Sequence, residues 1–166
     1  MIIELDADLI DRVTEVTHKV PGYFSPAYDK RTVSRTMGFL GEAAASIFLT
    51  GSDEAFLETW RQMVDQPDKP DLDRFPDIEI KTVPDIKSPH FAIGNGFTKT
   101  VKETNYLVFR KIRIDRIKVE GWLPAEEIQI AYDSSTGRRF PSGTPILPTW
   151  MLHPSESCPW RHADAS

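Results

Sequence analysis

The sequence contains a single cysteine, Cys158, among its 166 residues. One thiol cannot close an internal disulfide, and zinc sites built from several cysteines are excluded for the same reason. The four histidines show no pair at the i, i+4 spacing of a helical metal site. There is also no apolar run long enough to cross a bilayer, no signal-peptide pattern and no glycine-rich phosphate loop. We therefore expect a soluble, cytoplasmic protein with no membrane association.

Acidic residues outnumber basic residues over the chain as a whole, which has a formal net charge of -5. A uniformly basic surface is excluded, so nucleic-acid binding requires local positive charge. The segment 99–118 provides it, with seven Lys and Arg against two acids. We predict substrate contacts from Lys99, Lys102, Arg110 and Lys111, the first two in a flexible loop over 96–104. The alternative is a solvated hairpin rim without a ligand.

The length of the chain allows one domain over residues 1–166, with a core at about 33–130. We expect an N-terminal helix over 6–19 to pack on this core. From residue 140 onwards the chain is rich in proline, which predicts an irregular tail wrapped on the domain.

Helical periodicity continues beyond the first helix. We predict a loop over 23–31, a helix that begins at Ser34 and stops at Gly51, and a third helix over about 53–64. In the helix over 34–51, Gly38, Gly41 and three alanines give one face only small side chains. Another element can therefore approach that face closely. Glu42 lies within that stretch.

The most informative stretch is 70–82, PDLDRFPDIEIKT. In an extended strand, Asp77, Glu79 and Lys81 face one side and Ile78 and Ile80 the other. The two isoleucines would anchor the strand in a core, which leaves carboxylates and an ammonium group at an edge or cleft. Such oxygens suit a hard cation such as Mg²⁺, and the neighbouring Lys can steady an attacking water.

This stretch resembles the motif of the PD-(D/E)xK nuclease superfamily, in which an Asp is followed, after a short connection, by Glu-x-Lys on the next strand. Glu79 and Lys81 fit the tripeptide, and Asp71 fits the first acid. Asp77 is the rival, because Pro76-Asp77 reads literally as PD, but two residues leave no room for the usual turn; Asp73 is a third candidate. The Gly-Glu-Ala step at Glu42 also looks like the superfamily, in which a helical Glu often joins the metal site.

The segments after the motif extend the resemblance to about residue 128. They predict an apolar central strand over 105–112, a second strand over 117–123 and a short helix that opens at Pro124. A further strand is possible at 90–93. The resemblance implies an α/β (α+β) fold of the restriction-endonuclease-like kind, with a mixed central β-sheet flanked by helices.

The resemblance also implies an activity, a Mg²⁺- or Mn²⁺-dependent nuclease that hydrolyses DNA phosphodiester bonds, with RNA not excluded. Asp71, Glu79 and Glu42 would hold the metal, with the Ile80 carbonyl as a further ligand; Lys81 would orient the nucleophile and Thr82 support it. A homodimer would allow both strands to be cut. The alternative is a catalytically silent protein of the same fold that binds nucleic acid or a protein partner.

Overall fold

A computed structural model of the chain describes residues 1–19, 28–63, 71–84, 86–93, 104–134 and 145–162. Within these residues the protein is an α+β fold with a mixed four-stranded sheet in the order β1-β5-β4-β2. The strands are β1 (Ile2–Glu4), β5 (Arg116–Leu123), β4 (Asn105–Arg113) and β2 (Ile78–Val83). Strand β2 runs parallel to β4, and the other neighbours are antiparallel. The predicted fold class, a mixed central sheet flanked by helices, is confirmed.

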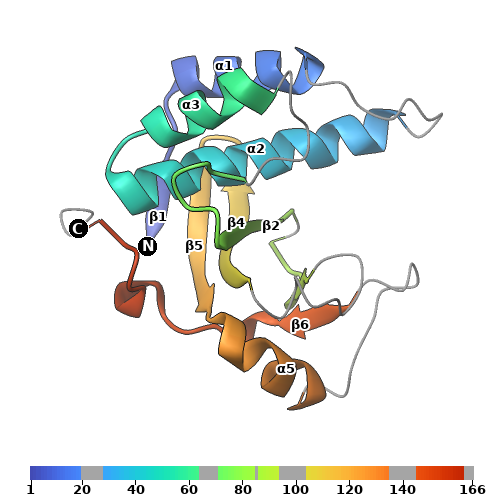
Figure 1. Cartoon of the computed structure of the whole chain (residues 1–166). Helices are drawn as coiled ribbons and strands as arrows, with labels where there is room; N and C mark the ends of the chain where they lie inside the picture. Colours follow the sequence, from blue (N-terminus) through green and yellow to red (C-terminus); the bar gives the residue numbers. More distant parts are fainter. Residues whose placement is uncertain (20–27, 64–70, 85, 94–103, 135–144, 163–166) are drawn as a thin grey trace.

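Three helices cover one face of this sheet (Figure 1): α1 (Ala7–Lys19), α2 (Tyr28–Thr50) and α3 (Glu54–Met63). Asp6 caps α1, because its Oδ1 accepts the N–H of Leu9 at 2.7 Å. Apolar side chains of α1, α2 and α3 pack with Ile78, Ile80 and the inward residues of β4 and β5 into the larger of two cores. The longest helix, α2, lies against the sheet, and α1 and α3 pack on the side of α2 that faces away from it. Glu42 belongs to α2.

The other face is covered by helix α5 (Ala125–Ser134) and a small antiparallel sheet of β3 (His90–Ala92) and β6 (Ile146–Pro148). Val83, Tyr106, Val108 and residues of α5, β3 and β6 form the second core there. Strand β4 is therefore buried on both faces, as its nearly continuous apolar run predicts.

The helical predictions hold with shifted boundaries. Gly51 ends α2 as expected, with a φ of 81° and its N–H donated to the Ile47 carbonyl at 2.8 Å. The predicted start at Ser34 is wrong, because α2 begins at Tyr28, inside the segment expected to be a loop. No glycine or proline lies within residues 28–37, so no strong helix breaker prevents the helix from beginning at Tyr28. Helix α5 likewise runs to Ser134, beyond the short helix expected.

Two features of the chain ends were not predicted. The first is β1, three residues long, which pairs with β5 at the far edge of the sheet. The second is order in the C-terminal part, which contains β6 and two 3₁₀ turns, Thr149–Met151 and Ser155–Ser157. The expectation of a wholly irregular tail is wrong, because Ile146 and Leu147 are buried and pair with β3. Among the described residues, no helix has the length and apolar character needed to cross a bilayer.

Gly41 sets the distance between α2 and β2. A Cβ atom at this position would lie 1.8 Å from Thr82 Oγ1 and 3.1 Å from Thr82 Cβ. Only a residue without a side chain lets the helix approach the strand so closely. The close approach holds the next residue, Glu42, against the sheet, as the run of small residues predicts.

We expect Gly41→Ala to destabilise the protein by about 1–3 kcal/mol, since the overlap with Thr82 forces the helix away from β2. This loss is net of alanine's better helix propensity, worth about 1 kcal/mol. Gly38→Ala is the matched control, because a Cβ there meets nothing within 4 Å. Urea unfolding of both variants measures the difference. Equal stability of the two variants would contradict the packing described.

Candidate active site

Four of the residues singled out in the sequence lie together at the free edge of β2. Glu79 and Lys81 come from β2 itself, Asp71 from the turn before it, and Glu42 from α2. Asp71, Glu79 and Lys81 all act electrostatically on Glu42. Helix α2, the turn at Asp71 and strand β2 thus place three carboxylates and one ammonium group in one region.

The turn that carries Asp71 is fixed to α3. Leu72 is fully buried in the larger core. The N–H of Asp73 donates to Thr59 Oγ1 at 2.8 Å, and Arg74 donates two hydrogen bonds, of 2.8 and 2.6 Å, to the carboxylate of Glu58. Packing and hydrogen bonds of the neighbouring residues therefore hold Asp71 in place in the turn.

The Asp71 carboxylate meets the backbone of β2 directly. Its Oδ2 accepts the N–H of Ile80 at 2.6 Å. In a strand, the N–H and C=O of one residue point to the same side, so the Ile80 carbonyl also faces this edge. The carboxylate and the carbonyl place two kinds of hard oxygen donor next to each other.

Glu79 and Lys81 follow the strand alternation predicted from the sequence. Ile78 and Ile80 are buried, while Glu79 and Lys81 are half-buried. Lys81 Nζ forms an ion pair with Glu79 Oε1. The ammonium group is thus held beside the carboxylates rather than directed into solvent.

Glu42 is the most deeply placed of the four. It is 9% exposed, and its Oε2 has no hydrogen-bond partner among the described residues. Burial raises its pKa well above the ordinary value, and the charges of Asp71 and Glu79 raise it further against the opposing effect of Lys81. A buried carboxylate oxygen without a partner costs free energy unless a proton or a cation satisfies it.

The pKa of Asp71 is also raised. Burial and the charge of Glu79 raise its pKa to about 6, while the Ile80 hydrogen bond and Lys81 act to lower it. Burial is the larger cause, because it disfavours the charged form of the carboxyl group, and the like charge of Glu79 adds to it.

Tyr106 belongs to this site and was missed in the sequence. It lies opposite Glu79 in the register of β2 and β4, and is 2% exposed. Burial raises the pKa of its hydroxyl, and the charges of Glu79 and Asp71 raise it further, so the hydroxyl stays protonated and can donate a hydrogen bond. A strand pattern alone gives no register, so the sequence held no signal for it.

The other candidates for the first acid, Asp77 and Asp73, have different surroundings. Asp77 is exposed just before β2, and its carbonyl accepts the N–H of Asn105 at 3.0 Å. Asp73 is half-buried in the turn, next to α3. Asp71, in contrast, acts electrostatically on Glu42 and accepts the N–H of Ile80. These two interactions group Asp71 with Glu42 and β2.

The outcome differs among the four residues predicted to contact the substrate. Lys99 and Lys102 lie outside the described residues. Arg110 is 6% exposed and pairs with Glu120 at 2.8 Å, so the exposed contact expected of it is wrong. Burial acts to raise the pKa of Glu120, but hydrogen bonds from Arg110 and Lys118 hold it below the ordinary value. Lys111 is half-buried near the end of β4.

Within the described part of the chain, no three His, Cys, Asp or Glu side chains already converge as a closed set of metal ligands. The hydrogen bonds explain this arrangement. Asp71 is turned to the Ile80 N–H and Glu79 to Lys81, which leaves Glu42 as the carboxylate with an unsatisfied oxygen.

Comparisons with protein-family models, with curated proteins and with solved structures give no significant match to this chain.

Proposed function

We propose that this protein is a Mg²⁺-dependent nuclease that hydrolyses DNA phosphodiester bonds. The observation that carries the proposal is the meeting of Glu42, Asp71, Glu79 and Lys81 at one edge of the sheet, with a buried Glu42 oxygen that lacks a partner. Packing that gathers excess negative charge in this way is unfavourable by itself, which is characteristic of functional sites.

The donor set fits a hard divalent cation. Carboxylates and a backbone carbonyl are the ligands that Mg²⁺ and Mn²⁺ prefer, and Asp71, Glu79, Glu42 and the Ile80 carbonyl would hold the ion. The bound ion would neutralise the excess carboxylate charge and lower the pKa of a coordinated water.

Lys81 has the central role among the chain's own groups. Its ammonium group donates to Glu79 and has two further N–H donors for an attacking water or a phosphate oxygen. The Tyr106 hydroxyl, kept protonated, is a neutral donor on the same face of the sheet. Thr82 Oγ1 is buried without a partner among the described residues and lies on the α2 side, where it can support Glu42.

The test is cleavage of labelled linear, circular, single-stranded and branched DNA, with RNA as a fifth substrate, in Mg²⁺, in Mn²⁺ and in EDTA. We expect metal-dependent cleavage of at least one DNA substrate, and the preferred one identifies the kind of nuclease. Pairing of two copies to cut both strands remains a prediction, which sedimentation of the DNA-bound protein addresses. Absence of metal-dependent cleavage with every substrate would contradict the proposal.

The second candidate is a catalytically silent protein of the same fold. The observation that favours it is the ion pair of Lys81 with Glu79, in a region where no described carboxylates converge as a closed ligand set. The two candidates differ in the effect of metal, because a ligand that binds the native state alone raises the melting temperature. Metal-induced stabilisation without cleavage would favour a silent, metal-binding relative.

A further inference from the structure

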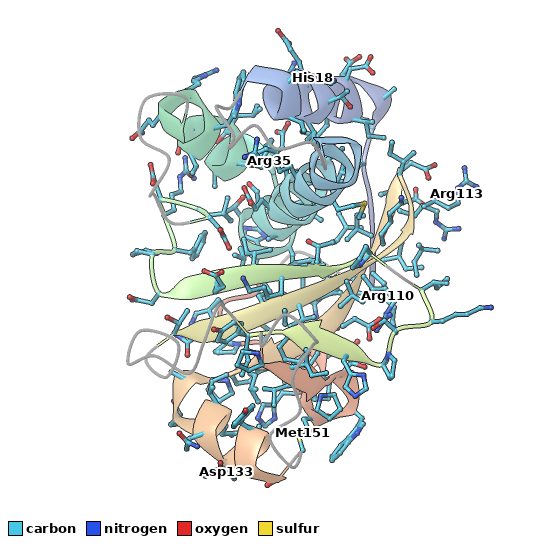
Figure 2. All side chains as sticks on the ribbon, turned by 90° about the vertical axis from the view of Figure 1, so that its right-hand side faces the viewer. His18, Arg35, Arg110, Arg113, Asp133 and Met151 are labelled. Atoms are coloured by element: carbon cyan, nitrogen blue, oxygen red, sulfur yellow. The ribbon has the colours of Figure 1, made fainter. Side chains whose placement is uncertain are left out.

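Helix α5 and the 3₁₀ turn after β6 border a hollow of about 570 Å³. Two large apolar side chains line it and are still mostly exposed, Ile130 by 66% and Trp150 by 76%. The other lining residues are Leu123, Glu127, Ala131 and Met151. In Figure 2 this region, marked by Asp133 and Met151, lies below the sheet, on the side opposite Arg35. Single exposed apolar residues are common, but two that come from separate segments and line one hollow indicate a binding surface.

Hydrogen bonds hold both walls of the hollow in place. The N–H of Thr149, next to Trp150, donates to the Pro89 carbonyl at 2.8 Å, which fixes the turn. On the other side, a hydrogen bond of 2.8 Å between Glu127 Oε2 and His153 Nε2 joins α5 to the chain after the turn. Because both walls are held before a ligand arrives, binding costs little conformational entropy on the protein side.

The charge around the hollow is negative. Glu127 precedes Ile130 by three residues on α5 and Asp133 follows it by three, so both acids neighbour it on the helix surface. Asp133 is exposed, and the side chain of Glu127 is 44% exposed. The two described segments that form the hollow, 123–134 and 145–151, contain no Lys or Arg. An apolar hollow with a negative rim complements a basic ligand with an apolar group, and it repels the phosphates of a nucleic acid.

We propose that this hollow binds a protein partner through a basic segment that carries one large apolar anchor side chain. The anchor contacts Ile130 and Trp150. Lys or Arg side chains beside the anchor pair with Glu127 and Asp133. An exposed tryptophan suits both parts of such a segment, because its ring packs on apolar groups and attracts cations to its face. The inference is independent of the proposed function, since it requires neither a metal nor DNA.

The experiment uses random peptides of about 15 residues displayed on phage, a length that covers one helix or one extended segment in a groove. The peptides are selected on the wild-type protein after depletion on the Ile130→Ala/Trp150→Ala double variant. We expect the enriched peptides to share an aromatic or large aliphatic residue flanked by Lys or Arg. A fluorescent copy of the most enriched peptide is then titrated by anisotropy, beside a version with Glu in place of Lys and Arg, which should not bind.

Ile130→Ala and Trp150→Ala should each weaken binding of the basic peptide at least about tenfold, because anchor contacts carry most of the binding free energy. Asp133→Asn should weaken binding severalfold in low salt and less in high salt. Ile86→Ala and Asp11→Asn are the matched controls, because both residues are exposed outside the hollow. The controls should bind the peptide like the wild type, and melting curves check that every variant is folded.

Three results would overturn the proposal. The first is selection without a basic consensus, and the second is binding by Ile130→Ala equal to that of Ile86→Ala. The third is a different occupant of the hollow. Sedimentation of a wild-type dimer that Trp150→Ala dissociates would assign the hollow to a second copy, and binding of a labelled DNA duplex that Trp150→Ala weakens would assign it to nucleic acid.

Discussion

Lys81→Met and Glu79→Gln are expected to reduce Mg²⁺-dependent DNA cleavage by about a thousandfold or more while the protein remains folded. Phosphoryl transfer is governed by positioning and by charge stabilisation, so loss of one donor or one oxygen acts on the transition state directly. The fold should tolerate both changes. The pair is 25% and 38% exposed, and ion pairs so exposed contribute about 0–1 kcal/mol to stability.

The measurement is single-turnover cleavage of the preferred DNA substrate, with circular dichroism and melting curves for each variant. Lys87→Met and Glu126→Gln are matched controls, because they make the same changes at exposed positions outside the site. They should cleave at the wild-type rate. Cleavage at the wild-type rate by either site variant would show that the residue changed in that variant takes no part in the reaction.

The metal-free protein is expected to become more stable as the pH falls from about 7 to about 4, through the contribution of Asp71. Its folded-state pKa is about 6, above the ordinary 3.8, so the folded state binds a proton more tightly than the unfolded chain. By linkage, this penalty is fully present above the folded-state pKa and disappears as the pH falls towards the unfolded value. The size expected is about 3 kcal/mol.

The comparison of wild type with Asp71→Asn isolates this contribution from other carboxylates, because an amide oxygen still accepts the Ile80 hydrogen bond. In EDTA, Asp71→Asn should be the more stable protein at pH 7.5, with the difference fading towards pH 4. Mg²⁺ or Mn²⁺ should act in the opposite sense and stabilise the wild type at pH 7.5 but not at pH 5, since ligation requires the ionised carboxylates. Parallel pH profiles for the two proteins would contradict the raised pKa of Asp71.

Patterns local in sequence predicted the burial along β2 and the close contact of α2. Alternation within 78–83 separates the buried isoleucines from Glu79 and Lys81, and the small residues around Glu42 indicate a close helix contact. What local patterns could not provide is how strands pair. The place of Tyr106 beside Glu79 depends on the β2–β4 register, and the burial of Arg110 depends on Glu120 across the hairpin.

The choice among Asp71, Asp73 and Asp77 shows the same limit. The sequence around the three aspartates does not distinguish them. In the structure, hydrogen bonds to Thr59 and Glu58 and the burial of Leu72 hold the turn, and Asp71 faces β2. A start signal for α2 at Ser34 failed because a capping residue is a weak signal when ordinary helix formers precede it.

The hydrogen bond from Ile80 to Asp71 has a consequence for solubility. Strand β2 is the last strand of the described sheet on its side, and an unpaired N–H on such a strand can recruit a strand from another molecule. The Asp71 carboxylate covers that N–H and places negative charge beside it. We therefore expect this side chain, besides its proposed role in metal binding, to hinder strand addition at the β2 edge.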